Sequence, residues 1–208
     1  MKVVAIITAR KGSKRLKNKN KLILGNKPLI SWTIDFAKKI KFINDIIMTT
    51  DDVDILNISK KKNILAPWIR PKRLSEDGTS SYLTVKHAVR WYEKNYSKID
   101  CICLLQPTSP FRLKQNMVNA FNIFKKKKES VISVMPKKIK NPFSLKNEKN
   151  KSYNLYIPSG SFFFISPKEL NKYRNFINKV NNLYLVSNVK ENIDINDIKD
   201  WNNAKAML

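Results

Sequence analysis

Residues 3–8, with the sequence VVAIIT, decide the fold of this chain, because they form an unbroken apolar run. A strand with one face in solvent alternates apolar and polar residues. An apolar run instead indicates burial on both faces, as in a parallel sheet covered by helices. Ala9 and Arg10 follow directly, without a small-residue cleavage site. We therefore expect a central β-strand here and not a signal peptide.

Strand-like and helix-like segments alternate from this run to about residue 135. The further expected strands are residues 45–50, 100–105 and 130–135. The expected helices, which carry apolar residues at three- and four-residue spacing, are residues 28–40, 53–61, 82–96 and 114–127. This alternation predicts an α/β fold: a Rossmann-like, mostly parallel sheet with helices on both faces.

The last third of the chain has a weaker pattern. Residues 136–150 are rich in Lys and Asn and lack a clear period, so we expect a flexible excursion from the main fold. The expected elements beyond it are strands at 153–157, 161–166 and 183–186 and a helix at 197–207. The length of 208 residues suits one domain, residues 1–208, with this small insertion inside it.

Three polar loops follow expected strands, so they can meet at one edge of the sheet. They are residues 9–20, 70–81 and 106–112. In open α/β sheets the ligand lies beyond the carboxyl ends of the strands. The first loop holds Gly12 for a tight turn and several cations, which suits a triphosphate, although a solvated basic loop has the same composition. It lacks the GxxxxGK[ST] pattern of a Walker loop.

The formal net charge of +25 leaves two classes of protein open. In a nucleic-acid-binding protein, aromatic residues should be interleaved with basic residues on one face. Here the lysines are spread along the whole chain and the aromatic residues lie at core-like positions. A positive field also attracts small anions, so we favour an enzyme that acts on anionic substrates and has no nucleic-acid partner. No run of about 18 apolar residues is present, so we expect no membrane span.

Cys101 and Cys103 lie two apart on an expected strand and share one face. Residues so close rarely form a disulfide, and a metal site needs more ligands than these two and the one histidine supply. We expect two buried, reduced thiols in a cytoplasmic protein. His87 is expected to be structural, and Asp51 and Asp52 to cap a helix.

Four segments, in order along the chain, resemble the acylneuraminate cytidylyltransferase family. Residues 9–20 (ARKGSKRLKNKN) are similar to the family's P-A-R-x-G-S-K-x-[IL]-P-x-K-N, and residues 70–77 (RPKRLSED) to its R-P-x-x-L-x-x-D. Residues 104–112 (LLQPTSPFR) match L-L-Q-P-T-S-P-[LF]-R, the most specific motif of the set. Residues 194–201 (DINDIKDW) are similar to D-I-D-T-x-x-D-[WFL].

The resemblance implies a nucleotide-diphospho-sugar transferase fold and an enzyme that joins CMP from CTP to the anomeric hydroxyl of a sialic-like nonulosonic acid, releasing pyrophosphate. It implies Mg²⁺ as cofactor, and a homodimer formed through the excursion at residues 136–180. The catalytic, phosphate-binding residues would be Arg10, Lys14 and Lys19. The nucleotide would meet Ala9, Arg10, Gly12, Ser13, Asn20, Arg70 and Ser81; the sugar would meet Gln106, Thr108 and Ser109; and Asp194 would hold the metal.

The chain departs from the family pattern at positions that bear on the substrate. Asn196 stands where the family has a second carboxylate, which favours one metal over two. Ile157 and Ser159 stand where sialic acid synthetases have the Arg and Asn of R-P-N-G-A, so a bidentate pair with the sugar carboxylate is not available there. N-acetylneuraminate is thus less favoured than legionaminic, pseudaminic or other bacterial nonulosonic acids.

A second reading within the same class is a 3-deoxy-manno-octulosonate cytidylyltransferase or another sugar nucleotidyltransferase. The octulosonate family shares an N-terminal P-A-R-x-x-S pattern but has Lys-Pro where this chain has Lys19 and Asn20. That difference argues against the second reading.

Overall fold

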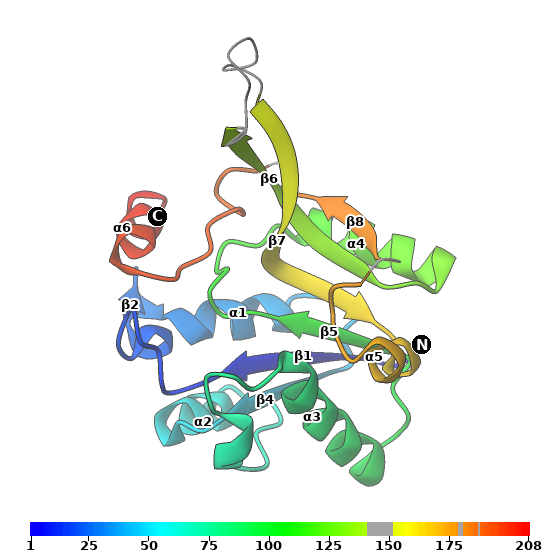
Figure 1. Ribbon diagram of the computed structural model, residues 1–208. Coiled ribbons are helices and arrows are strands. Elements are labelled where there is room, and N and C mark those ends of the chain that lie inside the picture. The colour runs from blue at the N-terminus through cyan, green and yellow to red at the C-terminus, as the bar shows by residue number, and fades with distance from the viewer. Residues whose placement is uncertain (141–151, 179–180, 187) are drawn as a thin grey trace.

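A six-stranded sheet organises the computed structural model, which describes residues 1–140, 152–178, 181–186 and 188–208, with 138–140 and 152–154 described by their backbone alone. The strand order is β4-β1-β5-β7-β6-β8 (Figure 1). The strands are β1 Val3–Ala9, β4 Asp45–Thr50, β5 Cys101–Leu105, β6 Val131–Lys140, β7 Ser152–Ile165 and β8 Asn182–Leu185. β7 runs antiparallel to β5 and β6, whereas the other pairings are parallel. The expected mostly parallel sheet is confirmed.

β1 has the central place that its apolar sequence predicts. It pairs with β4 on one side and β5 on the other, and its first five residues are at most 1 % exposed. Val3, Ala5 and Ile7 pack into the core on one face of the sheet, and Val4 and Ile6 into the core on the other. The run does not alternate because both of its faces are buried.

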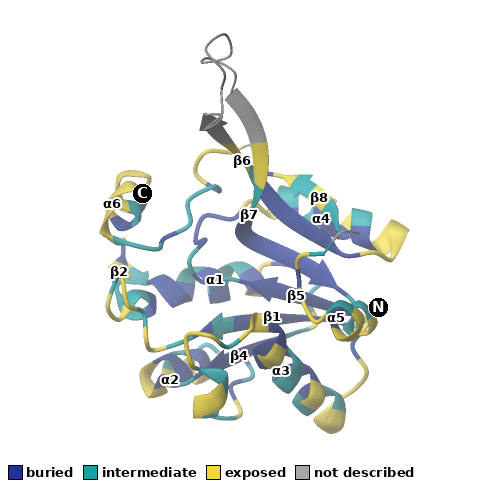
Figure 2. Ribbon diagram, viewed as in Figure 1, coloured by how far each residue is buried: buried dark blue, intermediate teal, exposed yellow. Residues whose placement is uncertain are grey.

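Helices cover both faces of the sheet, as expected. The helices are α1 Leu29–Lys38, α2 Val53–Lys61, α3 Ser81–Asn95, α4 Lys114–Lys127, α5 Pro167–Tyr173 and α6 Ile198–Ala206. Apolar residues of α1, α2 and α4 enter one core, and those of α3 and α5 enter the other. Figure 2 shows β1, β4, β5 and the inner helix faces mostly buried and the outer helix faces exposed.

A third, smaller core lies beside the carboxyl edge of the sheet. It joins α6 to the start of α1 and to the short hairpin of β2 (Ile23–Leu24) and β3 (Lys27–Pro28). Ile195, just before α6, is fully buried in it, together with Trp201. This packing fixes the residues that precede α6 at the edge where the strands end.

The region 136–180 differs from the expectation. β6 continues through Pro136 to Lys140, and residues 152–165 form one long strand, where we expected a loop followed by two short strands. The pairing with β8 covers residues 131–134, so Pro136 lies beyond it, where the missing N–H breaks no ladder bond on that side. The expected excursion is therefore largely sheet. Residues 141–151 and 179–180 of it lie outside the described part of the chain.

Helix α5 was not expected from the sequence. Ser166 is its N-cap, Pro167 opens it, and the side chains of Ser166 and Glu169 form a reciprocal capping box. The order Ser, Pro, then Glu three residues after the Ser is a known helix-start signal. The helix was missed because it has only 7 residues, too few to show an apolar period.

The structure confirms the two buried thiols and the cap at Asp52, whereas Asp51 accepts from Lys11 and Arg70 and does not cap a helix. Cys101 and Cys103 are free thiols that burial protects, and burial raises the pKa of both. Asp52 caps α2 by accepting from Asp54 N at 2.9 Å. Among the described residues, no three His, Cys, Asp or Glu side chains cluster as a metal site, and no helix is long and apolar enough to cross a membrane.

Candidate active site

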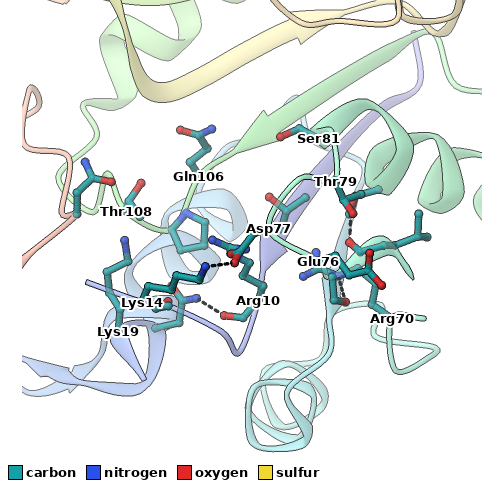
Figure 3. Close-up of a pocket in the computed structure, with 18 of the residues that line it drawn as sticks. Arg10, Lys14, Lys19, Arg70, Glu76, Asp77, Thr79, Ser81, Gln106 and Thr108 are labelled. Carbon is teal, nitrogen blue, oxygen red and sulfur yellow. Dashed lines mark hydrogen bonds and ion pairs between the residues drawn. The ribbon is translucent and has the colours of Figure 1, made fainter. Parts of the chain in front are cut away.

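A cavity of about 520 Å³ lies at the carboxyl edge of the sheet, where β1 and β5 end. Its walls come from the loop after β1, the segment at 70–84, the residues after β5 and the residues before α6 (Figure 3). Ten of the predicted site residues line it: Arg10, Ser13, Lys14, Lys19, Asn20, Arg70, Ser81, Gln106, Thr108 and Asp194. Four segments distant in sequence thus meet at one place, as parallel strand ends require.

The loop after β1 is fixed by contacts that leave its polar groups facing the cavity. Asp51 Oδ1 accepts from the backbone N–H of Lys11 at 2.9 Å, and Asn20 Nδ2 donates to the Arg10 carbonyl at 3.4 Å. Asn20 is only 7 % exposed, and its Oδ1 has no partner among the described residues. Asn20 therefore offers an unused acceptor at the cavity wall.

Lys19 joins this loop to the segment before α6. Its Nζ donates to the carbonyl of Ile195 at 2.6 Å. Burial lowers the pKa of Lys19, and the nearby carboxylate of Asp194 acts in the opposite direction. The cation is thus partly desolvated, which strengthens its pull on any anion in the cavity.

Arg70 is a buried cation held by two neighbours. Its Nε donates to Ser75 Oγ at 3.0 Å, and its Nη2 donates to Asp51 Oδ1 at 3.4 Å. Burial lowers the pKa of Arg70 and Asp51 opposes the shift, but a guanidinium stays charged at neutral pH. Asp51, which also anchors the first loop, therefore positions the second.

Helix α3 starts at the cavity. Ser80 is its N-cap, and its Oγ accepts from the backbone N–H of Tyr82 at 3.2 Å. Ser81, the first helical residue, lines the cavity. The positive end of a helix dipole and its unpaired N–H groups favour an anion at this point.

Asp77 lies between two of the predicted catalytic cations. Its Oδ1 pairs with Arg10 Nη1, and its Oδ2 lies 2.5 Å from Lys14 Nζ (Figure 3). Hydrogen bonds from Lys14 and then Arg10 lower the pKa of Asp77, so it stays ionised. The segment after Arg70 thus places a carboxylate against the cations of the first loop.

The residues after β5 are clamped to β7. Three consecutive carbonyl oxygens of β7 each accept one hydrogen bond from them. The bonds are Ser109 Oγ to Ser159 O at 2.9 Å, Gln106 N to Gly160 O at 3.4 Å and Arg112 Nε to Ser161 O at 2.6 Å. This clamp sets the position from which Gln106 and Thr108 line the cavity (Figure 3).

Arg112 is the buried centre of that clamp. Its Nη2 donates to the carbonyl of Gln106 at 2.5 Å, and its Nη1 donates to Thr33 Oγ1 of α1 at 2.9 Å. Burial lowers the pKa of Arg112 to about 10, so it is charged at neutral pH. One guanidinium therefore ties α1, β7 and the residues after β5 together.

Asp194 presents one free carboxylate oxygen. Asn196 Nδ2 donates to its Oδ2 at 2.7 Å, whereas its Oδ1 is buried and has no partner among the described residues. The N–H of Ile195 donates to the Thr108 carbonyl at 2.8 Å, which holds this segment beside the end of β5. An oxygen so placed is the kind of ligand that a hard divalent cation prefers.

Comparison with known proteins gives the family. A family model described as cytidylyltransferase matches residues 4–196. The chain belongs to the cytidylyltransferase family. The CMP-N,N'-diacetyllegionaminic acid synthase of Legionella pneumophila is 30 % identical over 97 % of this chain and 94 % of its own length.

Two other relatives match over about half of their own length. The N-acylneuraminate cytidylyltransferase of Escherichia coli is 31 % identical over 96 % of this cytidylyltransferase and 50 % of its own length. The pseudaminic acid cytidylyltransferase of Campylobacter jejuni is 34 % identical over 60 % of this chain and 53 % of its own. The family resemblance seen in the four motifs is confirmed.

Solved structures confirm the fold of the cytidylyltransferase. A CMP:2-keto-3-deoxy-manno-octonic acid synthetase complexed with CTP aligns over 100 % of this chain and 98 % of its own, with a TM-score of 0.72 at 14 % identity. A 4-diphosphocytidyl-2C-methyl-D-erythritol synthase aligns over 99 % and 98 %, with a TM-score of 0.73 at 12 % identity. The expected nucleotide-diphospho-sugar transferase architecture is therefore present.

Three predicted site residues of the cytidylyltransferase lie outside the cavity lining. Ala9 is 1 % exposed and belongs to the core. Gly12 is absent from the lining, but the expected tight turn is present around it, because the backbone N–H of Ser13 donates to the carbonyl of Lys11 at 2.9 Å. Ser109 is fully buried and its hydroxyl donates to Ser159 O, so it holds the clamp and does not face the cavity.

Other residues of the site were not predicted from the sequence. Arg15 lines the cavity, and its Nη2 donates to Asn196 Oδ1 at 3.3 Å. Asp77 and Arg112 belong to two of the four motifs, but the sequence around them does not show which residues they bind. Gly160 touches Gln106 only because the fold brings β7 beside β5.

Proposed function

We propose that this cytidylyltransferase transfers CMP from CTP to the anomeric hydroxyl of a nonulosonic acid and releases pyrophosphate. The observation that carries the proposal is the cavity, which is lined by five cations, three carboxylates and a set of amide and hydroxyl groups. The near-full-length relative from Legionella pneumophila, named for CMP-diacetyllegionaminic acid synthesis, supports the same reaction.

The basic side of the cavity suits the triphosphate. We assign the phosphates to Arg10, Lys14 and Lys19, because ammonium and guanidinium groups make charge-assisted hydrogen bonds to phosphate oxygens. The start of α3 at Ser81 adds a positive dipole end. Asn20, with its unused buried Oδ1, suits a nucleoside hydroxyl.

The side formed after β5 suits the sugar acid. Gln106 brings an amide and Thr108 a hydroxyl to the cavity wall, and both can donate and accept hydrogen bonds. A polyol needs such groups in a fixed arrangement. The clamp on β7, with Arg112 at its centre, supplies that rigidity.

The reaction forms one O–P bond and breaks one. The anomeric oxygen attacks the α-phosphorus of CTP, the bond from that phosphorus to the bridging oxygen breaks, and pyrophosphate leaves with the electron pair. The hydroxyl proton is released. Catalysis of such a transfer depends on positioning and on neutralising the charge of the phosphates, which the cations of the first loop can supply.

We propose Asp194 as the ligand of one Mg²⁺. Its buried, unpartnered Oδ1 fits a hard dication, and Asn196 holds the other oxygen by donating a hydrogen bond. Asn196 is therefore an orienting residue here, where the family has a second carboxylate. A bound Mg²⁺ would supply neutralisation of phosphate charge on the leaving side.

We also propose a cytoplasmic homodimer. Four apolar side chains on β7 and on the edge strand β8 are between 47 % and 56 % exposed: Leu155, Tyr156, Leu183 and Leu185. Exposed apolar side chains on β7 and β8, the two strands that flank β6, favour a protein contact. Light scattering of the purified protein tests the dimer, with a monomer mass as the contrary result.

The function is tested by measuring pyrophosphate release with Mg²⁺, CTP and a panel of acids. The panel holds N-acetylneuraminate, a diacetyllegionaminate, a pseudaminate and 3-deoxy-manno-octulosonate, with ATP replacing CTP as a control. Release with CTP and a nonulosonic acid is expected. Release with the octulosonate alone would favour the second reading. Failure to bind CTP, together with tight DNA binding near physiological salt, would overturn the proposal.

A further inference from the structure

Gly160 of β7 lies against the side chain that the sugar is expected to meet. It is one of two glycines with positive φ in the described chain, at +76°. Its carbonyl accepts from the backbone N–H of Gln106, as part of the clamp. The segment after β5 therefore packs directly against Gly160.

The space above Gly160 is filled by two polar side chains. A Cβ added there would lie 2.6 Å from Gln106 Oε1 and 2.7 Å from Ser109 Oγ. Both distances are far shorter than van der Waals contact. The side chain of Ser109 cannot give way freely, because it is fully buried and bonded to Ser159 O.

Gln106 is held on its other side as well. Arg112 binds its carbonyl and is itself buried, with bonds to Thr33 and Ser161. The backbone of Gln106 therefore cannot shift to relieve a contact at Gly160. A side chain at position 160 would have to turn the amide of Gln106 away.

We propose that Gly160 is a positioning residue for the sugar acid. Because Gly160 has no side chain, the amide of Gln106 can occupy the space above it and from there contact the substrate. This inference rests on the proposed function. Gly160 acts through Gln106 and touches no reacting atom. Its effect is therefore confined to the sugar side of the cavity.

The first test is Gly160→Ala, with Gly25→Ala as the matched control. Gly25 also has a positive φ, of +65°, but its added Cβ would meet side-chain atoms of Leu208 and Trp32. Both variants carry the same kind of backbone strain. In Gly160→Ala the KM for the sugar acid should rise about 10- to 100-fold, as expected for a contact displaced by about 1 Å. The KM for CTP should stay within about twofold, and Gly25→Ala should leave both unchanged.

A double-mutant cycle with Gln106→Ala shows whether the effect passes through Gln106. Removing Gln106 should raise the sugar KM, and adding Gly160→Ala to it should raise that KM no further. Additive effects, or an equal rise of both KM values in Gly160→Ala, overturn the inference. If Gly160→Ala does not fold, folding should return when Gln106→Ala and Ser109→Ala are added; no return also overturns it.

A readout without substrate separates this inference from the proposed function. In a ¹⁵N–¹H spectrum the side-chain amide signal of Gln106 should move in Gly160→Ala and stay in place in Gly25→Ala. If the amide moves but no sugar acid is turned over by the unchanged protein, the proposed function fails and the contact stands. If the amide does not move, the inference fails whatever the activity.

Discussion

At the scale of single residues, Asp77 would compete with CTP for the cations that we propose bind its phosphates. It pairs with Arg10 and Lys14, which we assign to the phosphates of CTP. Its pKa is lowered by those two partners, so the competition persists at neutral pH. On this assignment, the phosphates of CTP would replace the Asp77 carboxylate as the partner of these cations.

Asp77→Asn should therefore lower the KM for CTP. The change keeps the shape of the side chain and removes its charge. Because both pairs are exposed to solvent, the fall should be modest, on the order of two- to fivefold. Steady-state kinetics with CTP varied measures it. Glu76→Gln is the control, since Glu76 lines the same cavity and forms no ion pair among the described residues. A higher KM in Asp77→Asn would show that Asp77 helps to bind the nucleotide.

Asp194 and Asn196 give opposite predictions for Mg²⁺. Asp194→Asn removes the proposed ligand charge, so the Mg²⁺ concentration for half-maximal rate should rise by more than about tenfold. Asn196→Asp adds a carboxylate beside it, so that concentration should fall. Titration of the initial rate with Mg²⁺ measures both. Unchanged titrations in both variants would rule out this site.

Lys19 predicts how CTP binding depends on pH. Its pKa is lowered by burial from 10.5, so it loses its charge at a lower pH than an exposed lysine does. The Kd for CTP should therefore rise as the pH increases through that lowered value, and calorimetry at several pH values measures it. Lys19→Arg should remove the rise, because arginine stays protonated. The same rise in Lys19→Arg would assign it to another group.

The lowered pKa of Lys19 also makes the stability of the fold depend on pH. A lysine whose pKa is lower in the folded state binds its proton more weakly there than in the unfolded chain. Its unfavourable contribution is thus complete at low pH and is relieved as the pH rises from the folded-state value towards 10.5. Substrate binding and folding respond to this titration in opposite directions.

At the scale of elements, the first turns of α3 and α5 differ in their distance from the cavity, although both are capped by a serine. Ser80 caps α3, whose first turn faces the cavity. Ser166 caps α5, which packs on the sheet away from the residues that line the cavity. Both hydroxyls accept a backbone N–H, from Tyr82 at 3.2 Å and from Glu169 at 3.1 Å.

Loss of either cap should cost about the same stability but not the same activity. Ser80→Ala and Ser166→Ala should each lower the free energy of unfolding by about 0.5–2 kcal/mol. Only Ser80→Ala should also raise the KM for CTP, because the helix start that it frays faces the phosphates. Denaturant melts and kinetics on both variants check this. An equal KM change in both would separate α3 from nucleotide binding.

At the scale of the whole molecule, the sequence predicts an element well wherever burial imposes a regular spacing of apolar residues on it. The doubly buried run at 3–8 and the helical spacing at 114–127 correspond closely to β1 and α4. The pattern failed at 136–165, because strands that extend from the sheet carry polar residues and a proline. Those strands are held by each other, which no local period reveals.

The candidate site divides in the same way. Motifs indicated which residues would gather, and ten of the predicted ones do line the cavity. Contacts between distant segments could not be read from motifs. The pairing of Asp77 with Arg10, the clamp on β7 and the fit of Gln106 over Gly160 all depend on which strands lie side by side.

The most direct test of the account is product analysis with the unchanged protein and with Arg10→Ala. CTP, Mg²⁺ and the sugar acid found in the panel are incubated with each, and CMP-sugar and pyrophosphate are quantified by chromatography and mass spectrometry. We expect equal amounts of both products from the unchanged protein, dependent on the sugar acid, and almost none from Arg10→Ala, whose circular dichroism spectrum should be unaltered. Pyrophosphate without CMP-sugar, or undiminished turnover in Arg10→Ala, would contradict it.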